Sequence, residues 1–291
     1  MTTGPWPPGR CFAGGMNSNY SGSTGRFASR RHLPRTVCTT AVAAVLGVAL
    51  VGCGSQGSAD AVGPTKAGAA DSGAKVLWVG DSIAGAEAPA LGAALKSSGV
   101  DFKDASSDGG GTVVDGGDEI TGKISEDTWK ELAANIGSFK PTVIAYQITT
   151  YDWGPQDKQR AAYEKLARTA KDAGAKLVLV PAPPVKIDDF YKKHEPQMRA
   201  APKAAEEAAK NSGGAAVFLD SAQLWGTDAA AAKAQRSSDG IHNCQQGAAA
   251  FAKWLSERLG SQAGFKAAPV DAWAKGSWTG DARYANLKCG G

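Results

Sequence analysis

Histidine is scarce in this chain of 291 residues, which contains three: His32, His194 and His242. The five cysteines are scattered along the sequence, so no cluster of cysteine and histidine offers the four ligands of a structural zinc site. We therefore expect no metal and no other cofactor.

Basic residues are not in excess once the first segment is set aside. The formal net charge is +4, with 32 basic and 28 acidic residues, but five arginines precede Cys53 and no acidic residue does. Residues 53–291 therefore carry 27 basic and 28 acidic side chains, a net charge of −1. Without a basic patch, the sequence gives no reason to expect nucleic acid as a partner.

Long hydrophobic runs are also missing. The apolar stretch at residues 37–51 is shorter than the roughly 18 residues expected of a membrane-spanning helix. It follows a cluster of arginines and ends at the small residue Gly52, which is the layout of an export signal. We predict that residues 1–52 are a signal peptide and do not belong to the folded protein.

The end of this signal, Leu50-Val51-Gly52-Cys53, resembles the lipobox of bacterial lipoproteins. The resemblance implies cleavage before Cys53, a lipid on its sulfur, and anchoring at the outer face of the cytoplasmic membrane or in the cell envelope; two acyl chains suffice for this. An uncleaved anchor and a plain secretory signal are the alternatives. Residues 53–73, rich in Gly, Ala and Ser, predict a flexible tether, and residues 74–291 the folded domain.

Cys244 and Cys289 are the two cysteines left once the signal is removed and Cys53 is lipidated. Exported proteins seldom keep two free thiols, so we predict that these two form a disulfide. Two unpaired cysteines, one buried and one on a loose tail, are the alternative.

Short apolar runs alternate with helix-length segments, which predicts an α/β fold with a five-stranded parallel sheet and right-handed crossovers. The predicted strands are residues 76–79, 100–105, 142–148, 176–180 and 215–219. The predicted helices are residues 84–96, 124–139, 158–173, 190–211, 228–235 and 245–259. Pro196 and Pro202 are expected to interrupt the fourth helix or to begin new turns. The tail at 265–291 is expected to wrap back over the domain.

Ser82 lies where the first predicted strand ends and a helix begins, after Gly80 and Asp81. Ligands of open α/β sheets bind at this end of the strands, and a helix amino terminus favours negative charge. One interpretation makes Ser82 a reactive hydroxyl. The other makes Asp81 and Ser82 simple helix caps, and this stretch alone does not separate the two.

The two histidines of the predicted domain have different surroundings. His242 follows Asp239 by three positions in a loop before the last helix, so the carboxylate can reach the imidazole and hold its tautomer. His194, by contrast, lies among charged residues typical of a solvated face.

The blocks Gly80-Asp81-Ser82-Ile83 and Asp239-Gly240-Ile241-His242 resemble the first and last blocks of the SGNH, or GDSL-type, hydrolases. Their order and spacing match, and the resemblance covers about residues 74–260. It implies a flavodoxin-like three-layer α/β/α fold and ester hydrolysis through an acyl-enzyme. Carried over, Ser82 is the nucleophile, His242 the general base and acid, and Asp239 the orienting carboxylate.

The resemblance also implies an oxyanion hole. Its donors would be the Ser82 amide and a glycine amide of the run 109–111, which we assign to Gly110 and Gly111. The family's third block, Gly-x-Asn-Asp, supplies an asparagine amide, but here the third strand ends in Gln147-Ile148-Thr149-Thr150-Tyr151-Asp152. Gln147, or the hydroxyl of Thr149 or Tyr151, would have to substitute; otherwise the enzyme is slow or inactive.

The expected substrate is an acylated carbohydrate of the cell envelope or another small ester, from which a short acyl group, such as acetyl, is removed. A sugar O-acyltransferase and a non-catalytic carbohydrate-binding lipoprotein are the alternatives. We expect a monomer. The tail aromatics Trp273, Trp278 and Tyr284 are interpreted as packing residues, with sugar stacking as the alternative.

Overall fold

The computed structural model describes residues 71–231 and 235–289. The predicted signal peptide, Cys53 and nearly all of the predicted tether lie outside the described residues. They therefore stay predictions.

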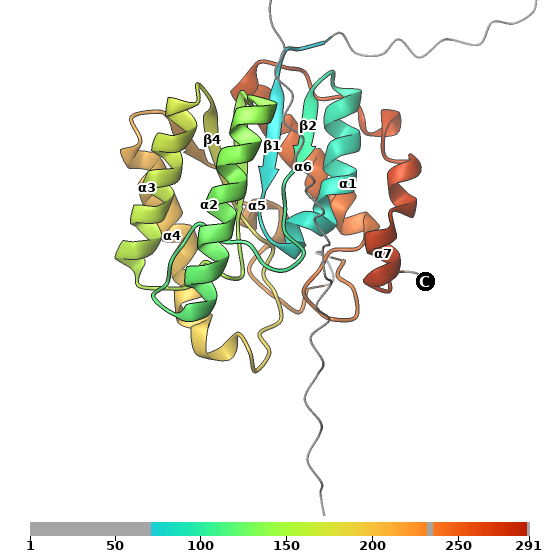
Figure 1. Cartoon of the computed structure of the whole chain (residues 1–291). Helices are drawn as coiled ribbons and strands as arrows, with labels where there is room; N and C mark the ends of the chain where they lie inside the picture. Colours follow the sequence, from blue (N-terminus) through green and yellow to red (C-terminus); the bar gives the residue numbers. More distant parts are fainter. Residues whose placement is uncertain (1–70, 232–234, 290–291) are drawn as a thin grey trace, which may run out of the picture. The chain divides into compact units, whose positions relative to one another are not determined.

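A five-stranded sheet forms the centre of the domain (Figure 1). All neighbouring strands are parallel, in the order β2-β1-β3-β4-β5, which confirms the predicted sheet. β1 has β2 on one side and β3 on the other, so the strand order reverses there, and ligands bind at such a point outside the carboxyl ends of the strands. The strands are β1 (Lys75–Val79), β2 (Asp101–Asp104), β3 (Val143–Ile148), β4 (Lys176–Pro181) and β5 (Ala216–Phe218).

Helices cover both faces of the sheet, so that the central strands are apolar on both sides (Figure 1). In β1, Val76 and Trp78 pack into the core on the side of α1 (Ser82–Ser97) and α6 (Gln245–Ala263). Leu77 and Val79 pack into the opposite core. That second core is closed by α2 (Glu119–Phe139), α3 (Gln156–Asp172) and α4 (Glu195–Asn211).

Two predicted helix starts were wrong. α2 begins at Glu119 rather than near residue 124, because the Asp118 carboxylate accepts hydrogen bonds from the amides of Ile120 and Thr121, both at 3.0 Å, and caps the helix there. α4 begins at Glu195, after a 3-10 turn, η1 (Lys192–His194).

The predicted effect of the prolines in this region was also wrong in part. Pro196 lies in the first turn of α4, where its missing N–H costs nothing, but Pro202 lies inside the helix without ending it. Of the short helix predicted at residues 228–235, residues 228–231 form a turn and 232–234 lie outside the described residues.

The carboxyl-terminal tail packs against α1 and α6. It comprises η3 (Val270–Ala272), η4 (Ser277–Gly280) and α7 (Ala282–Asn286). One further short helix, α5 (Ala222–Trp225), lies between β5 and α6. The tail aromatics Trp273, Trp278 and Tyr284 are buried, and the Tyr284 hydroxyl donates to the Ala86 carbonyl at 3.0 Å, so they serve packing rather than sugar stacking.

Cys244 and Cys289 form a disulfide with a Cα–Cα distance of 5.4 Å. Because Cys244 is the N-cap residue of α6, the bond ties the end of the tail to the start of that helix. Within the described ranges, no helix is long and apolar enough to cross a membrane.

Candidate active site

Ser82 is the first residue of α1, directly after the turn that ends β1. Asp81 supplies the helix cap: its Oδ1 accepts the Ile83 amide at 2.9 Å, and its Oδ2 accepts both the amide and the hydroxyl of Thr150 at 2.9 Å. The cap is therefore made by Asp81 alone, and the Ser82 hydroxyl has another partner.

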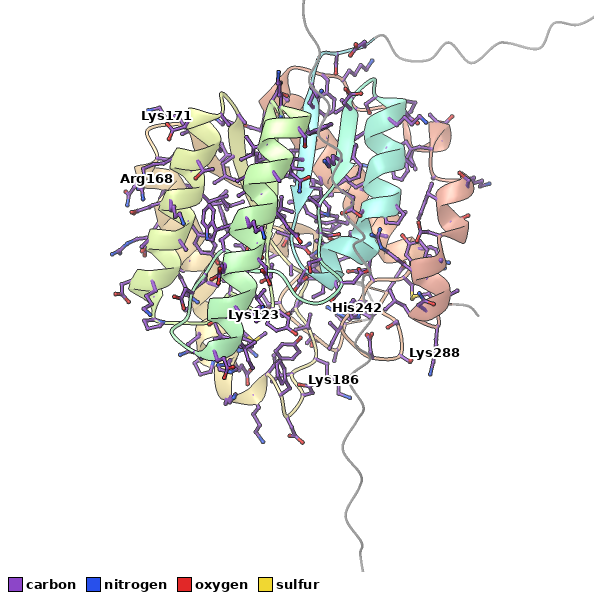
Figure 2. The ribbon with its side chains drawn as sticks, viewed as in Figure 1. Lys123, Arg168, Lys171, Lys186, His242 and Lys288 are labelled. Carbon is purple, nitrogen blue, oxygen red and sulfur yellow. A yellow bond between two sulfur atoms is a disulfide. The ribbon has the colours of Figure 1, made fainter. Side chains whose placement is uncertain are left out.

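That partner is His242, which lies 160 residues away in the sequence. The Ser82 Oγ lies 2.8 Å from Nε2 of His242, and Nδ1 of the same ring lies 2.7 Å from Oδ2 of Asp239. β1 points toward the end of the domain where His242 lies, at the carboxyl edge of the sheet (Figures 1 and 2). A serine, a histidine and an aspartate in this order can pass the hydroxyl proton to the ring while the carboxylate holds the tautomer.

The loop that carries Asp239 and His242 is closed on itself. Oδ1 of Asp239 accepts the amides of Ile241 and His242 at 2.7 and 3.0 Å. Burial alone would raise the pKa of Asp239, but hydrogen bonds from the His242 ring, from these amides and from Ser237 lower it to about 2. The carboxylate is therefore ionised at any pH near neutrality, and it holds a proton on Nδ1 of His242.

The predicted glycine donors lie beside Ser82, in a segment that we call the glycine loop, residues 107–114. The Ser107 amide donates to the Gly80 carbonyl at 3.0 Å. A Cβ on Gly111 would lie 2.6 Å from that same carbonyl oxygen, so only glycine allows this approach. Gly110 has φ +97°, with the Tyr151 ring against it.

Backbone hydrogen bonds separate the two glycines. The Gly110 amide donates to the Ser107 carbonyl at 3.4 Å, whereas the amides of Gly111 and Ser82 donate to no group in the described part of the chain. Gly111 and Ser82 therefore keep the free N–H groups that a developing anion requires.

Gln147 does not take the place of the third-block asparagine, which corrects one expectation. Its Nε2 donates to Oε2 of Glu87 at 2.6 Å, in a fully buried position between β3 and α1. Burial, reinforced by the charge of Asp81, raises the pKa of Glu87 well above its usual value, although the bond from Gln147 opposes this. The alternation of β3 explains the placement: Ala145 faces the same core, whereas Tyr146 and Ile148 face the other.

The Thr149 hydroxyl is also engaged, since it donates to Oδ1 of Asp152 at 3.1 Å. Tyr151 is the third-block side chain that lies against the glycine loop.

Asp152 and Thr150 also support the site, although neither was assigned a role from the sequence. Asp152 is fully buried and accepts hydrogen bonds from four hydroxyl groups. Thr150 joins the end of β3 to Asp81. The available signal was the third block itself, because Asp152 stands at the position of its final aspartate.

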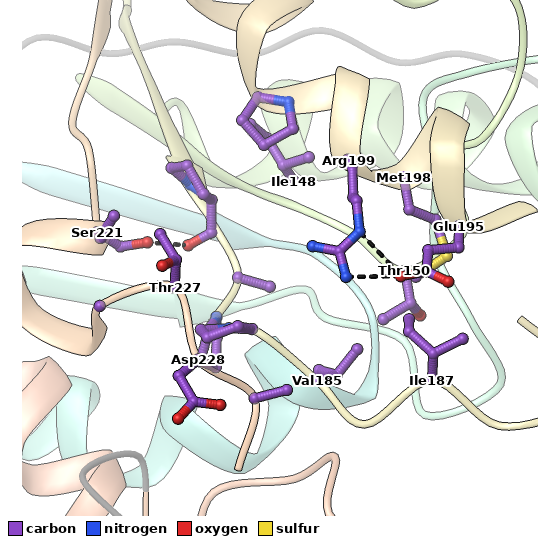
Figure 3. A pocket seen from close by; sticks show the side chains of 18 of the residues that line it. Ile148, Thr150, Val185, Ile187, Glu195, Met198, Arg199, Ser221, Thr227 and Asp228 are labelled. Carbon is purple, nitrogen blue, oxygen red and sulfur yellow. Dashed lines mark hydrogen bonds and ion pairs between the residues drawn. The ribbon is translucent and has the colours of Figure 1, made fainter. Parts of the chain in front are cut away.

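A cavity of 590 Å³ lies beyond Thr150, at the carboxyl ends of β3, β4 and β5 (Figure 3). Its walls are largely apolar, and Arg199 and Glu195 form an ion pair at its rim. None of Ser82, Asp239 and His242 lines it, so the cavity by itself does not identify the reaction.

Among the described residues, no three His, Cys, Asp or Glu side chains are grouped so that they could hold a metal ion. His194 stacks on the Trp153 ring at a centroid distance of 3.8 Å and serves packing.

Several solved structures are similar to this chain. A protein described as an acylhydrolase from Bacteroides fragilis is 12% identical with a TM-score of 0.50, over 65% of this chain and 88% of that one. A GDSL-like lipase from Bacteroides thetaiotaomicron is also 12% identical, with a TM-score of 0.48 over 65% and 88% of the two chains. A catalytic mutant of an acetylxylan esterase from Geobacillus stearothermophilus is 15% identical, with a TM-score of 0.46 over 67% and 96%.

At these identities the first likeness establishes the fold alone. No curated protein matches the chain. A family model described as an SGNH domain (fused to AT3 domains) matches residues 52–255, which is more than half of the sequence and includes both motif blocks. The chain belongs to this SGNH domain family.

Proposed function

We propose that the protein is a serine esterase in which Ser82 is the nucleophile, His242 the general base and acid, and Asp239 the orienting carboxylate. The observation that supports this is the chain of hydrogen bonds at 2.8 and 2.7 Å through the two nitrogens of His242. Nε2 takes the Ser82 proton as Oγ attacks the ester carbonyl, and passes it to the alcohol oxygen as the ester bond breaks and the alcohol leaves. Water then attacks the acyl-enzyme: Nε2 takes a proton from the water and gives it to Oγ of Ser82 as the acyl–oxygen bond breaks, which releases the carboxylic acid and restores the serine.

The oxyanion of each step needs hydrogen-bond donors. We propose the amides of Ser82 and Gly111, which have no other acceptor among the described residues. The Ser82 amide also belongs to the first turn of α1, where the helix dipole favours negative charge. Tyr151, against the glycine loop, stands where the family has asparagine and is the remaining third-block donor.

Gly111→Ala is expected to lower kcat by about 10² to 10³, because the new Cβ would push the amide away from Gly80 and lose one donor to the oxyanion. Gly109→Ala is the matched control, since a Cβ there meets nothing within 4 Å. The measurement is kcat for p-nitrophenyl acetate. Equal kcat values for the two variants would remove Gly111 from the oxyanion hole.

For the substrate, we propose short acyl esters, acetyl above all, on carbohydrate of the cell envelope or outside the cell. The test is acetate release from acetylated sugars by the full chain. No release from any acetylated sugar, together with hydrolysis of longer acyl esters, would overturn the acetyl proposal. If a sugar hydroxyl rather than water resolves the acyl-enzyme, acylated sugar accumulates in place of acetate.

We also propose that the protein is an exported lipoprotein anchored through Cys53. The support is the placement of Cys53 directly after the apolar part of the signal. Metabolic palmitate labelling should depend on Cys53, and labelling that survives Cys53→Ala would contradict the anchor.

A further inference from the structure

We propose that Asp152 is a positioning residue that fixes the glycine loop and with it the Gly111 amide. This inference rests on the proposed function, in which the Gly111 amide stabilises the oxyanion. Asp152 touches neither Ser82 nor His242 through any hydrogen bond of the described residues, so its effect on the chemistry passes through other groups.

Oδ1 of Asp152 connects the glycine loop to β3. It accepts the Thr112 hydroxyl at 2.5 Å and the Tyr146 hydroxyl at 2.7 Å. All three side chains are fully buried, so no bulk water competes for these bonds. Thr112 belongs to the glycine loop and follows Gly111 directly, whereas Tyr146 and Asp152 come from β3 and the segment after it.

Further hydrogen bonds join the two hydroxyls to the backbone of the glycine loop. The Thr112 Oγ1 accepts the Val114 amide at 2.9 Å, and the Tyr146 Oη accepts the Val113 amide at 3.1 Å. An ionised carboxylate only accepts hydrogen bonds, so each hydroxyl must give its proton to Asp152 and turn its lone pairs toward an amide. Asp152 thereby sets the direction of two of the bonds that hold the loop after Gly111. Two others come from α2, where the Thr128 hydroxyl accepts the Thr112 amide at 3.3 Å and the Trp129 ring donates to the Val113 carbonyl at 3.1 Å.

The other carboxylate oxygen has a different role. Oδ2 accepts the Tyr163 hydroxyl at 2.7 Å and the Thr149 amide at 3.3 Å, and neither group belongs to the glycine loop. Tyr163 lies on α3 and is as fully buried as Thr112. The hydroxyls of Thr112 and Tyr163 are both buried and both donate to Asp152, but only Thr112 belongs to the glycine loop. Variants of these two residues can therefore be compared.

The test compares Thr112→Val and Tyr163→Phe in the full chain. Both remove one buried hydroxyl bonded to Asp152, so both should lower Tm, and Thr112→Val should lower it more because it also removes the acceptor of the Val114 amide. Thr112→Val should in addition lower kcat for p-nitrophenyl acetate by about tenfold to a hundredfold with KM nearly unchanged. The reason is that a displaced Gly111 amide no longer donates well to the oxyanion of the transition state. Tyr163→Phe should keep kcat within about twofold. Burial raises the pKa of Asp152 to about 6, although its hydrogen bonds oppose this rise. The assays should therefore be run near pH 8, where Asp152 is ionised.

Hydrogen exchange gives a second measurement that does not depend on activity. The Val113 and Val114 amides should exchange faster in Thr112→Val than in Tyr163→Phe. Tyr146→Phe should resemble Thr112→Val and replaces it if the latter does not fold. Equal kcat and equal exchange in the loop-side and α3-side variants would overturn the role of Asp152. A wild-type chain without esterase activity would instead overturn the proposed function, and the exchange comparison would still decide the role of Asp152.

Discussion

Replacing Ser82 with alanine is expected to lower kcat for ester hydrolysis by about 10⁶, the scale found when a triad nucleophile is removed. The change deletes the oxygen that lies 2.8 Å from Nε2 of His242, so no acyl-enzyme can form. The fold should persist, because Asp81, not Ser82, caps α1. The measurement is intact mass after treatment with a fluorophosphonate, together with kcat.

Ser98→Ala is the matched control for Ser82→Ala. Ser98 stands at the other end of the same helix, where its buried hydroxyl donates to the Ala94 carbonyl at 2.7 Å. This variant should lose some stability, keep the single adduct and keep kcat. An adduct that persists in Ser82→Ala, or a folded wild-type protein that takes up no fluorophosphonate, would contradict Ser82 as the nucleophile.

The sheet could be predicted because its central strands are buried on both faces. Val76 to Val79, for example, form an unbroken apolar run with no polar residue to obscure it. The start of α2 could not be found from periodicity, since residues 119–123 include the exposed Ile120 and supply little of the core. Its boundary is instead set by Asp118, a local cap that a search for apolar spacing does not see.

In the candidate site, the serine, histidine and aspartate could be placed from two short motifs, because each motif is local and keeps its own geometry. The roles of Gln147 and Asp152 could not, because they depend on partners brought together by the sheet. Gln147 meets Glu87 across 60 residues, and Asp152 meets Thr112 across 40. Such contacts leave no periodic signal in the sequence.

The hydrogen bonds that support the site also join residues that are far apart in the sequence. The turn before Ser82 is held by Thr150, the glycine loop by the Gly80 carbonyl, and the His242 loop by a bond from the Lys186 amide to the Gly240 carbonyl at 3.0 Å. Each bond joins segments that follow different strands, at one edge of the sheet. The strand order brings these segments together, so the reactive groups acquire their geometry only when the whole sheet has formed.

Asp239→Asn is expected to lower kcat by about 10⁴ while leaving the fold nearly intact. Oδ1 of Asp239 accepts two backbone amides, from Ile241 and His242, and only an oxygen can do this. The asparagine oxygen must therefore take that place, and its NH₂ group then faces Nδ1 of His242. A ring nitrogen that accepts from NH₂ carries no proton, so the proton moves to Nε2, which can no longer take the proton of Ser82.

The control for Asp239→Asn is Asp118→Asn, because Asp118 also accepts two backbone amides with one oxygen while its other oxygen receives a ring nitrogen, Nε1 of Trp153 at 2.7 Å. The same reasoning places an NH₂ group against the Trp153 N–H, which costs stability but does not touch His242. Both kcat and Tm are measured for the two variants. Asp239→Asn should have a much lower kcat with little change in Tm, and Asp118→Asn should have a lower Tm with little change in kcat. If Asp239→Asn kept more than about a tenth of the wild-type kcat, the carboxylate would not be setting the tautomer of His242, and the proposed proton path from Ser82 would need another base.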